Sequence, residues 1–359
     1  MPAPPDAPAP PRPPLGDGLP GAAVPVVTPA PGAAPPVGLD ALRAPVAEHL
    51  RVFRGLFRES MRSRVRLLDA VVQYLLQRKG KEIRPTLVLL SAELCGGITE
   101  RTYRAATLVE LLHTATLVHD DVVDESDTRR GVASVNALWK NKVGVLLGDY
   151  LLSRGLLLAL DDGDYDLLHV VSDAVRRMSE GELLQIETAR RLDMTEARYF
   201  QIIADKTGSL IAACMAAGAA SAGADAETVA RAKAVGETIG LAFQIRDDLF
   251  DYDGAAAVGK PVGLDLQDRK MTLPLIAALD AAPPAEARRV RRVVRKRRKS
   301  RAEVREVLAF VEAAGGAAAA RARMEALAGE AAAALGAFPP SPARDALAGL
   351  CTYVVARRR

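Results

Sequence analysis

The stretch HTATLVHDDVVD, residues 113–124, places three acidic side chains on an otherwise apolar segment. Asp120, Asp121 and Asp124 stand at positions i, i+1 and i+4. On a helix, Asp120 and Asp124 therefore lie one turn apart, with Asp121 beside them. Three like charges on an apolar helix repel one another and lose hydration. The stretch predicts a helix whose acidic edge binds a hard divalent cation.

The acidic pattern occurs a second time in QIRDDLFD, residues 244–251, where Asp247, Asp248 and Asp251 have the same spacing. One copy alone would be weak evidence, because acidic turns are common on exposed helices. Mg²⁺ prefers carboxylate oxygens and shares its remaining positions with waters and substrate phosphates. Two copies on apolar helices predict Mg²⁺ as the cofactor and a diphosphate as the substrate.

The apolar residues are spaced with helical periodicity from Leu39 onward, and strand-like alternation is nearly absent. The pattern predicts an all-α fold, a bundle of roughly ten to twelve mostly antiparallel helices. The clearest predicted helices cover 99–125, 142–160, 166–191, 196–221, 226–253, 271–282, 286–313, 317–336 and 343–356. Several of them are apolar around most of their circumference, so we expect them at the centre of the bundle.

The N-terminal region differs in composition from the rest of the chain. Residues 1–38 hold 14 of the 23 prolines and only three charged residues. Such a segment cannot bury a core, so we expect a disordered tail at 1–38 and one helical domain at 39–359. Docking of the tail to a proline-recognising groove is a less favoured alternative.

Composition excludes several classes of protein. No run of 18 apolar residues and no signal-peptide pattern is present, so we expect a cytoplasmic enzyme. The three cysteines have neither zinc-ligand nor disulfide spacing. The formal net charge of +4 is modest for 359 residues, so we expect no nucleic-acid partner.

Basic residues accompany both acidic motifs. Arg129 and Arg130 follow the first, and Lys260 follows the second in Gly259-Lys-Pro261. Lys81 and Arg84 form a further pair, which we expect one turn apart at the start of a helix. These cations can bind diphosphate oxygens, whereas the alternative for the last pair is an ordinary solvated helix end.

Taken together, these motifs, with Lys206-Thr207 and GKPVGLD at 259–265, resemble the trans-isoprenyl diphosphate synthase family, the head-to-tail polyprenyl synthetases. The resemblance spans about residues 60–275. It implies helices around a deep central cavity, usually in a homodimer, with both aspartate motifs holding magnesium. It assigns the allylic diphosphate to Arg129, Lys206, Thr207, Gln244, Lys260 and Lys270. It assigns isopentenyl diphosphate to Lys81, Arg84, His113 and Arg130.

The chain departs from the family pattern at three positions. Lys79 and Glu82 stand where a glycine and a basic residue are frequent, and Arg269 replaces a frequent glycine. Glu82 places a negative charge near the expected isopentenyl site. Of two histidines near the first motif, His113 matches a binding position of the family, whereas we expect His119 to hydrogen-bond within the helix layer.

The resemblance implies addition of isopentenyl diphosphate to a geranyl, farnesyl or geranylgeranyl primer. Small residues before the first motif, Ala115 and Thr116, and below them Leu112, predict a long all-trans product, of the kind used in a quinone side chain. The alternatives are a short-chain farnesyl or geranylgeranyl synthase, a class I terpene cyclase or a non-catalytic subunit. Lys81 and Arg84 disfavour the cyclase, because a cyclase needs no second diphosphate site.

The run 288–301 contains ten basic residues in fourteen. Val290, Val294 and Val307 form an apolar stripe through it, so we expect an amphipathic helix with a basic outer face. That face is either simply solvated or makes transient contact with an anionic membrane surface.

Overall fold

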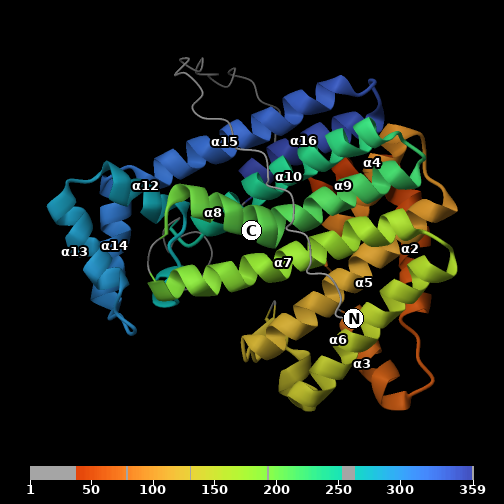
Figure 1. Ribbon diagram of the computed structural model, residues 1–359, viewed down its shortest axis with the longest axis horizontal. Helices are drawn as coiled ribbons and strands as arrows, with labels where there is room; N and C mark the ends of the chain where they lie inside the picture. The colour runs from red at the N-terminus through yellow and green to blue at the C-terminus, as the bar shows by residue number, and fades with distance from the viewer. Residues whose placement is uncertain (1–37, 78–79, 130, 192–193, 253–262, 358–359) are drawn as a thin grey trace, which may run out of the picture. The chain divides into compact units, whose positions relative to one another are not determined.

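The computed structural model describes residues 38–77, 80–129, 131–191, 194–252 and 263–357, and they form a helical bundle (Figure 1). The α-helices are α1 Leu39–Arg43, α2 Ala47–Ser60, α3 Arg66–Leu76, α4 Ile83–Cys95, α5 Glu100–Val123, α6 Val135–Asp161, α7 Tyr165–Arg191, α8 Glu196–Ile203, α9 Ser209–Ser221, α10 Ala226–Leu249, α11 Leu264–Gln267, α12 Leu273–Ala281, α13 Pro284–Val294, α14 Arg301–Ala313, α15 Gly316–Ala334 and α16 Pro342–Ala356. Short helices at Ala44–Val46, Ala204–Gly208 and Leu335–Ala337 link some of them. The predicted all-α fold is confirmed, and residues 1–37 of the tail expected at 1–38 lie outside the described residues.

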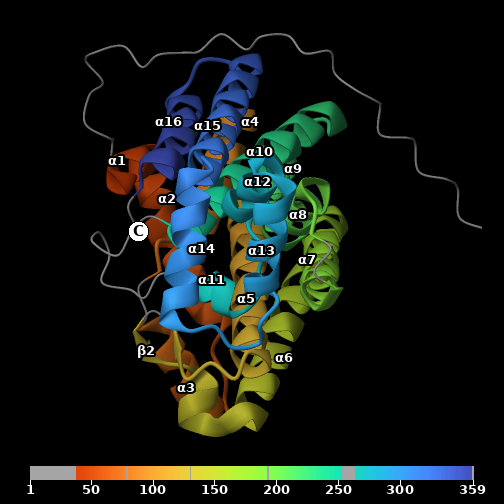
Figure 2. The same ribbon diagram turned by 90° about the vertical axis from the view of Figure 1, so that its left-hand side faces the viewer.

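The two strands of the described chain form a minimal hairpin directly after the first acidic motif. β1, Thr128–Arg129, pairs antiparallel with β2, Val132–Ala133, and Arg129 stands opposite Val132. Figure 2 shows this hairpin beyond the end of α5. The hairpin turns the chain back at once, so Arg129 stays beside the aspartates that precede it.

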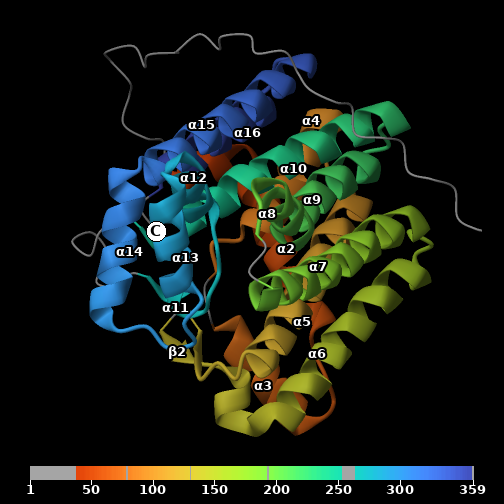
Figure 3. The same ribbon diagram turned by 60° about the vertical axis from the view of Figure 1, so that its left-hand side comes forward.

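Helix α9 lies at the centre of the bundle, with α4, α5, α7 and α10 packed around it (Figure 3). Its residues are apolar on every side and nearly all buried, as expected for an interior helix. Glycines allow its neighbours to approach closely. A Cβ on Gly218 would lie 2.3 Å from the carbonyl oxygen of Val88, and one on Gly236 would lie 2.8 Å from the Cα of Ala212.

Glycines also bring α6 against α5. A Cβ on Gly155 would lie 2.4 Å from a methyl group of Leu112, and one on Gly148 would lie 2.1 Å from Nε2 of His119. The same His119 nitrogen is 3.3 Å from the Val145 carbonyl oxygen and 3.4 Å from the Asp149 carboxylate. His119 therefore packs between the two helices, as expected for a residue of the helix layer.

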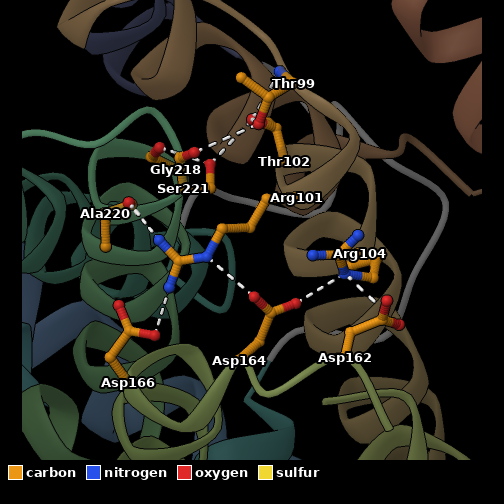
Figure 4. A network of polar contacts seen from close by, with 10 residues as sticks. All are labelled: Thr99, Arg101, Thr102, Arg104, Asp162, Asp164, Asp166, Gly218, Ala220 and Ser221. Atoms are coloured by element: carbon orange, nitrogen blue, oxygen red, sulfur yellow. Dashed lines mark hydrogen bonds and ion pairs between the residues drawn. The ribbon is translucent and has the colours of Figure 1, made fainter.

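A polar network ties the start of α5 to the turn before α7 and to the end of α9 (Figure 4). Asp164, which is 4% exposed, accepts hydrogen bonds from Nε of Arg101 at 2.8 Å and from Nε of Arg104 at 2.6 Å. Arg101 also donates to the Ala220 carbonyl oxygen at 2.8 Å. Burial alone would raise the pKa of Asp164, but the two arginines hold it below its ordinary value. The network anchors the helix that carries the first acidic motif.

The predicted helix at 286–313 is wrong, because the chain forms two helices there, α13 and α14. Five consecutive cations, residues 295–299, separate them. Like charges in successive helical turns repel one another. Ser300 then starts α14 with a capping box, in which its hydroxyl accepts from the Glu303 amide at 3.2 Å and Glu303 accepts from the Ser300 amide at 2.8 Å.

Other boundaries differ by less. The predicted helix at 142–160 begins earlier, at Val135, and bends at Lys140, which has φ 71°. The predicted helix at 226–253 ends at Leu249, so Asp251 lies beyond it. The predicted helix at 196–221 contains a π-helical turn at Ala204–Gly208. Such turns are rare and often occur at functional sites.

Two helical segments are long and apolar enough, by length and composition alone, to cross a membrane. In the segment Glu196–Ser221, 78% of the most apolar window is buried, as expected for the core helix of a globular protein. In Val135–Asp161 only 33% is buried. Much of the apolar surface of α6 is therefore exposed in the described part of the chain.

Candidate active site

A cavity of about 690 Å³, including its open mouth, lies between α7, α8, the π turn, α10, α11 and the segment that precedes α12. Four residues predicted for the allylic diphosphate line it together, from three separate segments of the chain: Lys206, Thr207, Gln244 and Lys270. Asp248 and Asp265 line the same cavity, and its remaining wall is mostly apolar. The structure therefore assembles cations, an amide and carboxylates on the wall of a mostly apolar cavity.

A chain of hydrogen bonds fixes the polar side of this cavity. The Thr207 hydroxyl donates to Oε1 of Gln244 at 2.7 Å, and Nε2 of Gln244 donates to Oδ1 of Asp248 at 2.8 Å. The Tyr199 hydroxyl donates to the other Asp248 oxygen at 2.6 Å. Burial raises the pKa of Asp248 to about 7, although these two hydrogen bonds oppose the rise. Tyr199 was missed by the sequence analysis, since no local pattern links it to a residue 49 positions away.

The first acidic motif lies at the end of α5. Asp121 is 4% exposed and accepts a hydrogen bond from Nε of Arg129 at 2.6 Å. Loss of hydration raises the pKa of Asp120, and nearby Lys206 opposes that rise. Lys206 also opposes the rise that burial causes in the pKa of Asp265. Lys206 therefore connects the first motif electrostatically with the cavity.

Each lysine of the cavity already faces acidic groups. Lys206 forms an ion pair with Glu182, and its Nζ is 3.4 Å from Oε1 of Gln185. Nζ of Lys270 lies 3.8 Å from Asp265 and 3.6 Å from Asp268. The side chains of Lys206 and Lys270 are 39% and 40% exposed, and exposed ion pairs are weak, so a diphosphate can replace these partners. Glu182 and Gln185 are further residues that the sequence analysis did not identify.

The second acidic motif is held by contacts from distant segments. Asp251 accepts hydrogen bonds from the amides of Leu264 at 2.9 Å and Asp265 at 3.0 Å, and so fixes the start of α11. Asp247 forms an ion pair with Arg357, a residue 110 positions further along the chain. The guanidinium of Arg357 stacks 3.8 Å from the centre of the Phe243 ring.

The carboxylates fit Mg²⁺ by their chemistry. Burial or loss of hydration raises the pKa of five aspartates in this region, Asp120, Asp247, Asp248, Asp251 and Asp265. Such destabilised negative charges favour a bound divalent cation. Within the described ranges, no three acidic, histidine or cysteine side chains form a ready-made metal cage. Mg²⁺ is commonly held by one or two carboxylates together with substrate phosphates.

The residues predicted for isopentenyl diphosphate lie around the start of α4 and on α5. Lys81 precedes α4, whereas Arg84 lies in its first turn, so the expectation that the pair shares a helix is wrong. Lys81 opposes the rise that burial causes in the pKa of Asp247, and therefore lies near the second motif. His113 is buried on α5, at 7% exposure. Arg130 and Lys260 lie outside the described residues.

The buried thiol of Cys214 lies close to Arg84 and to a residue of α5. Burial raises the pKa of Cys214 to about 12, with Arg84 opposing and Glu110 adding to the rise. Arg84 and Glu110 therefore both lie close to this thiol. Glu110 stands one turn before His113 on α5 and was not identified from sequence, although an acidic residue on an apolar helix face was a usable signal.

The residues predicted to control chain length lie apart from the cavity. Ala115 and Leu112 are 2% and 1% exposed on α5, and Leu112 packs against Gly155 of α6. The Thr116 hydroxyl donates to the His113 carbonyl oxygen at 2.8 Å. None of the three lines the cavity described above.

Comparison with known proteins identifies the family of the chain. The model of the family described as polyprenyl synthetase matches residues 65–311. The chain belongs to the polyprenyl synthetase family. It is 36% identical over 324 residues to an octaprenyl diphosphate synthase from Escherichia coli, covering 90% of this chain and 100% of that relative. A decaprenyl diphosphate synthase structure from Rhodobacter capsulatus is similar to it, with a TM-score of 0.84, 37% identity and coverage of 90% and 100%.

A polyprenyl synthase structure from Caulobacter crescentus, complexed with calcium and isoprenyl diphosphate, is also similar, with a TM-score of 0.83 and 34% identity over 91% of this chain and 100% of that one. Membership of the family confirms the predicted enzyme class, a prenyltransferase of isoprenoid biosynthesis. The similarity to these long-chain synthases favours the predicted long-chain function over the short-chain and cyclase alternatives.

Proposed function

We propose that this polyprenyl synthetase adds isopentenyl diphosphate units head to tail to an allylic diphosphate primer of the geranyl, farnesyl or geranylgeranyl type. The product is a long all-trans polyprenyl diphosphate suited to a quinone side chain. The observation that carries the proposal is the meeting of Lys206, Thr207, Gln244 and Lys270 in one cavity beside Asp248. Such a set binds a diphosphate and leaves an apolar hollow for hydrocarbon.

The reaction begins when the allylic diphosphate leaves, so charge builds up on its oxygens. Lys206, Lys270 and Arg129 would hold that charge, and Mg²⁺ bound through Asp120 and Asp247 would add Lewis-acid stabilisation. Thr207 and Gln244 orient the diphosphate through their mutual hydrogen bond. The apolar wall excludes water, which would otherwise trap the allylic cation.

The second substrate requires its own anion site close to the first. Lys81, Arg84 and His113 would bind the diphosphate of isopentenyl diphosphate, with Lys81 near Asp247. The alkene of isopentenyl diphosphate then attacks the allylic carbon and forms the new carbon–carbon bond. The released diphosphate takes up the proton that leaves the adjacent carbon, so no protein nucleophile is needed.

The test is a condensation assay with labelled isopentenyl diphosphate, a farnesyl primer and Mg²⁺. Asp120→Ala and Asp247→Ala should each lower turnover by about three orders of magnitude or more, since each removes a metal ligand. Asp280→Ala, an exposed residue of α12, is the matched control. Near-normal turnover in either motif variant would contradict the magnesium site. Consumption of the primer without isopentenyl diphosphate would identify a cyclase instead.

We propose that the chain works as a homodimer joined along α6. Large apolar side chains of α6 remain exposed: Leu138 at 49%, Val145 at 42%, Leu146 at 58%, Leu157 at 46% and Leu160 at 46%. Several large exposed apolar side chains on one helix are typical of a protein interface. Light scattering should give twice the chain mass, and Leu146→Glu should shift it towards the monomer. A monomeric wild type would contradict the proposal.

We propose a cytoplasmic location with transient contact to anionic membranes through the basic segment 288–301. Arg295, Arg297 and Arg298 are exposed, while Val294 and Val304 on the flanking helices are buried. Phosphatidylserine vesicles should bind the protein at low salt. A variant with Gln in place of Arg295, Arg297 and Arg298 should not bind them. Binding that is unchanged in this variant would leave the basic face as ordinary solvated surface.

A further inference from the structure

Glu82 stands between the two cations assigned to isopentenyl diphosphate, Lys81 and Arg84. A basic residue is frequent at this position in the chains that the sequence resembles, so the carboxylate reverses the local charge. A diphosphate carries several negative charges, and a free carboxylate next to its site would repel it. Binding of a diphosphate here therefore requires a positive charge that compensates Glu82.

The structure supplies the compensating charge from another helix. Arg54 of α2 donates from Nε to Oε1 of Glu82 at 2.9 Å and from Nη2 to Oε2 at 2.7 Å. Both carboxylate oxygens are thus engaged by one guanidinium in the planar two-bond arrangement that arginine forms with carboxylates. Nothing in the local sequence pairs these residues, which are 28 positions apart.

The backbone of Glu82 is also fixed. Its φ of 43° and ψ of 34° place it in the left-handed region, which non-glycine residues seldom adopt. Its carbonyl oxygen accepts from the Thr86 amide at 3.1 Å and the Thr86 hydroxyl at 2.7 Å. The turn that joins Lys81 to Arg84 is therefore held by Thr86 at the main chain and by Arg54 at the side chain.

We propose that Arg54 is a positioning residue for isopentenyl diphosphate, which acts by neutralising Glu82 and keeping the potential between Lys81 and Arg84 positive. The inference rests on the proposed function, because that function places the diphosphate at these two cations. A stability role is insufficient to explain the pair, since the Arg54 side chain is 46% exposed and exposed ion pairs contribute little. Loss of Arg54 has a larger effect on the binding of a multiply charged ligand nearby, because each charge of the ligand then interacts with the unpaired Glu82 carboxylate.

The experiment compares Arg54→Ala, Glu82→Gln and the double variant in steady-state assays with isopentenyl diphosphate varied at saturating primer. Arg54→Ala should raise KM for isopentenyl diphosphate roughly tenfold while kcat and the KM for the primer stay within about twofold. Glu82→Gln should lower KM for isopentenyl diphosphate, because it leaves the Arg54 charge uncompensated, while kcat and the KM for the primer stay near wild type. The double variant should recover the wild-type KM, because no charge is left to neutralise.

Salt and a conservative variant give independent readouts. The Arg54→Ala defect should shrink at high ionic strength, since it arises from charge repulsion. Arg54→Lys, which keeps the charge but not the two-bond geometry, should show only part of the defect. Arg51→Ala is the matched control, because Arg51 forms an ion pair with Glu48 on the same helix and should change no kinetic parameter.

Two outcomes would overturn the proposal. One is an unchanged KM in Arg54→Ala, and the other is a double variant as impaired as Arg54→Ala, which would mean that the pair acts by holding the turn. Lys81→Ala is assayed in parallel and should raise the same KM. If Lys81→Ala raises it and Arg54→Ala does not, the inference about Arg54 alone fails. If neither raises it, the assignment of the isopentenyl site fails instead.

Discussion

The buried carboxylate of Asp248 should make the metal-free protein less stable as pH rises. Its pKa is raised from 3.8 to about 7, mainly by burial, and its side chain accepts from Tyr199 and Gln244. Between these two values the unfolded chain has lost the proton while the folded chain keeps it. Folding stability therefore falls as pH rises from about 4 to 7 and levels off above 7.

The magnitude follows from the size of the shift. One pKa unit corresponds to about 1.4 kcal/mol, so the rise from pH 5 to 7 should lower the free energy of unfolding by roughly 2 to 3 kcal/mol. Asp248→Asn cannot titrate but keeps an oxygen that accepts from Tyr199. The free energy of unfolding of Asp248→Asn, relative to that of wild type, should therefore rise by roughly 2 to 3 kcal/mol between pH 5 and 8.

Urea denaturation of both proteins in a metal chelator, at several pH values, measures the difference directly. Asp225→Asn is the control, because the pKa of Asp225 lies below its ordinary value and the residue is already ionised over this range. Adding Mg²⁺ should stabilise wild type more at pH 8 than at pH 5, since metal and proton compete for the carboxylates. Parallel pH dependences of wild type and Asp248→Asn would refute the reasoning.

Two further predictions concern product length and the anchoring of α5. Ala115→Phe should shorten the product to about C15 or C20, because we expect the growing chain to pass this position of α5, and an added ring at a site that is 2% exposed takes up that space. Chromatography of the products checks this, and an unchanged length would contradict it. Asp164→Ala should lower the free energy of unfolding by about 3 kcal/mol, because it leaves Arg101 and Arg104 without their shared buried partner. Chemical denaturation measures the loss, and a loss below about 1 kcal/mol would indicate that the network in Figure 4 is not stabilising.

The structure adds features of the site that sequence reasoning could not supply. Arg357 contacts Asp247 from the end of α16, and Tyr199 contacts Asp248 from α8. Each contact joins two helices, and the order of the helices along the chain does not specify which of their faces meet. The backbone of Arg269, with φ 61°, is likewise in the left-handed region, which glycine adopts most readily.

The sequence by itself determined the helices and the chemistry they carry. Helical periodicity and the i, i+1, i+4 spacing of two aspartate motifs depend only on neighbours within one or two turns, so they can be read from the chain directly. A capping box also depends only on residues close in sequence. The capping box of Ser300 and Glu303, which starts α14 after α13, could therefore have been recognised from the sequence.

Tertiary structure alone decided which charges meet. The carboxylate of Glu82 is compensated by Arg54, and the π turn brings Lys206 between Asp120 and the cavity. These pairings depend on how closely the helices pack, which glycines such as Gly181 permit: a Cβ there would lie 2.9 Å from the Lys206 amide nitrogen. Packing distances of this kind arise from the whole bundle, so no local stretch of sequence specifies them.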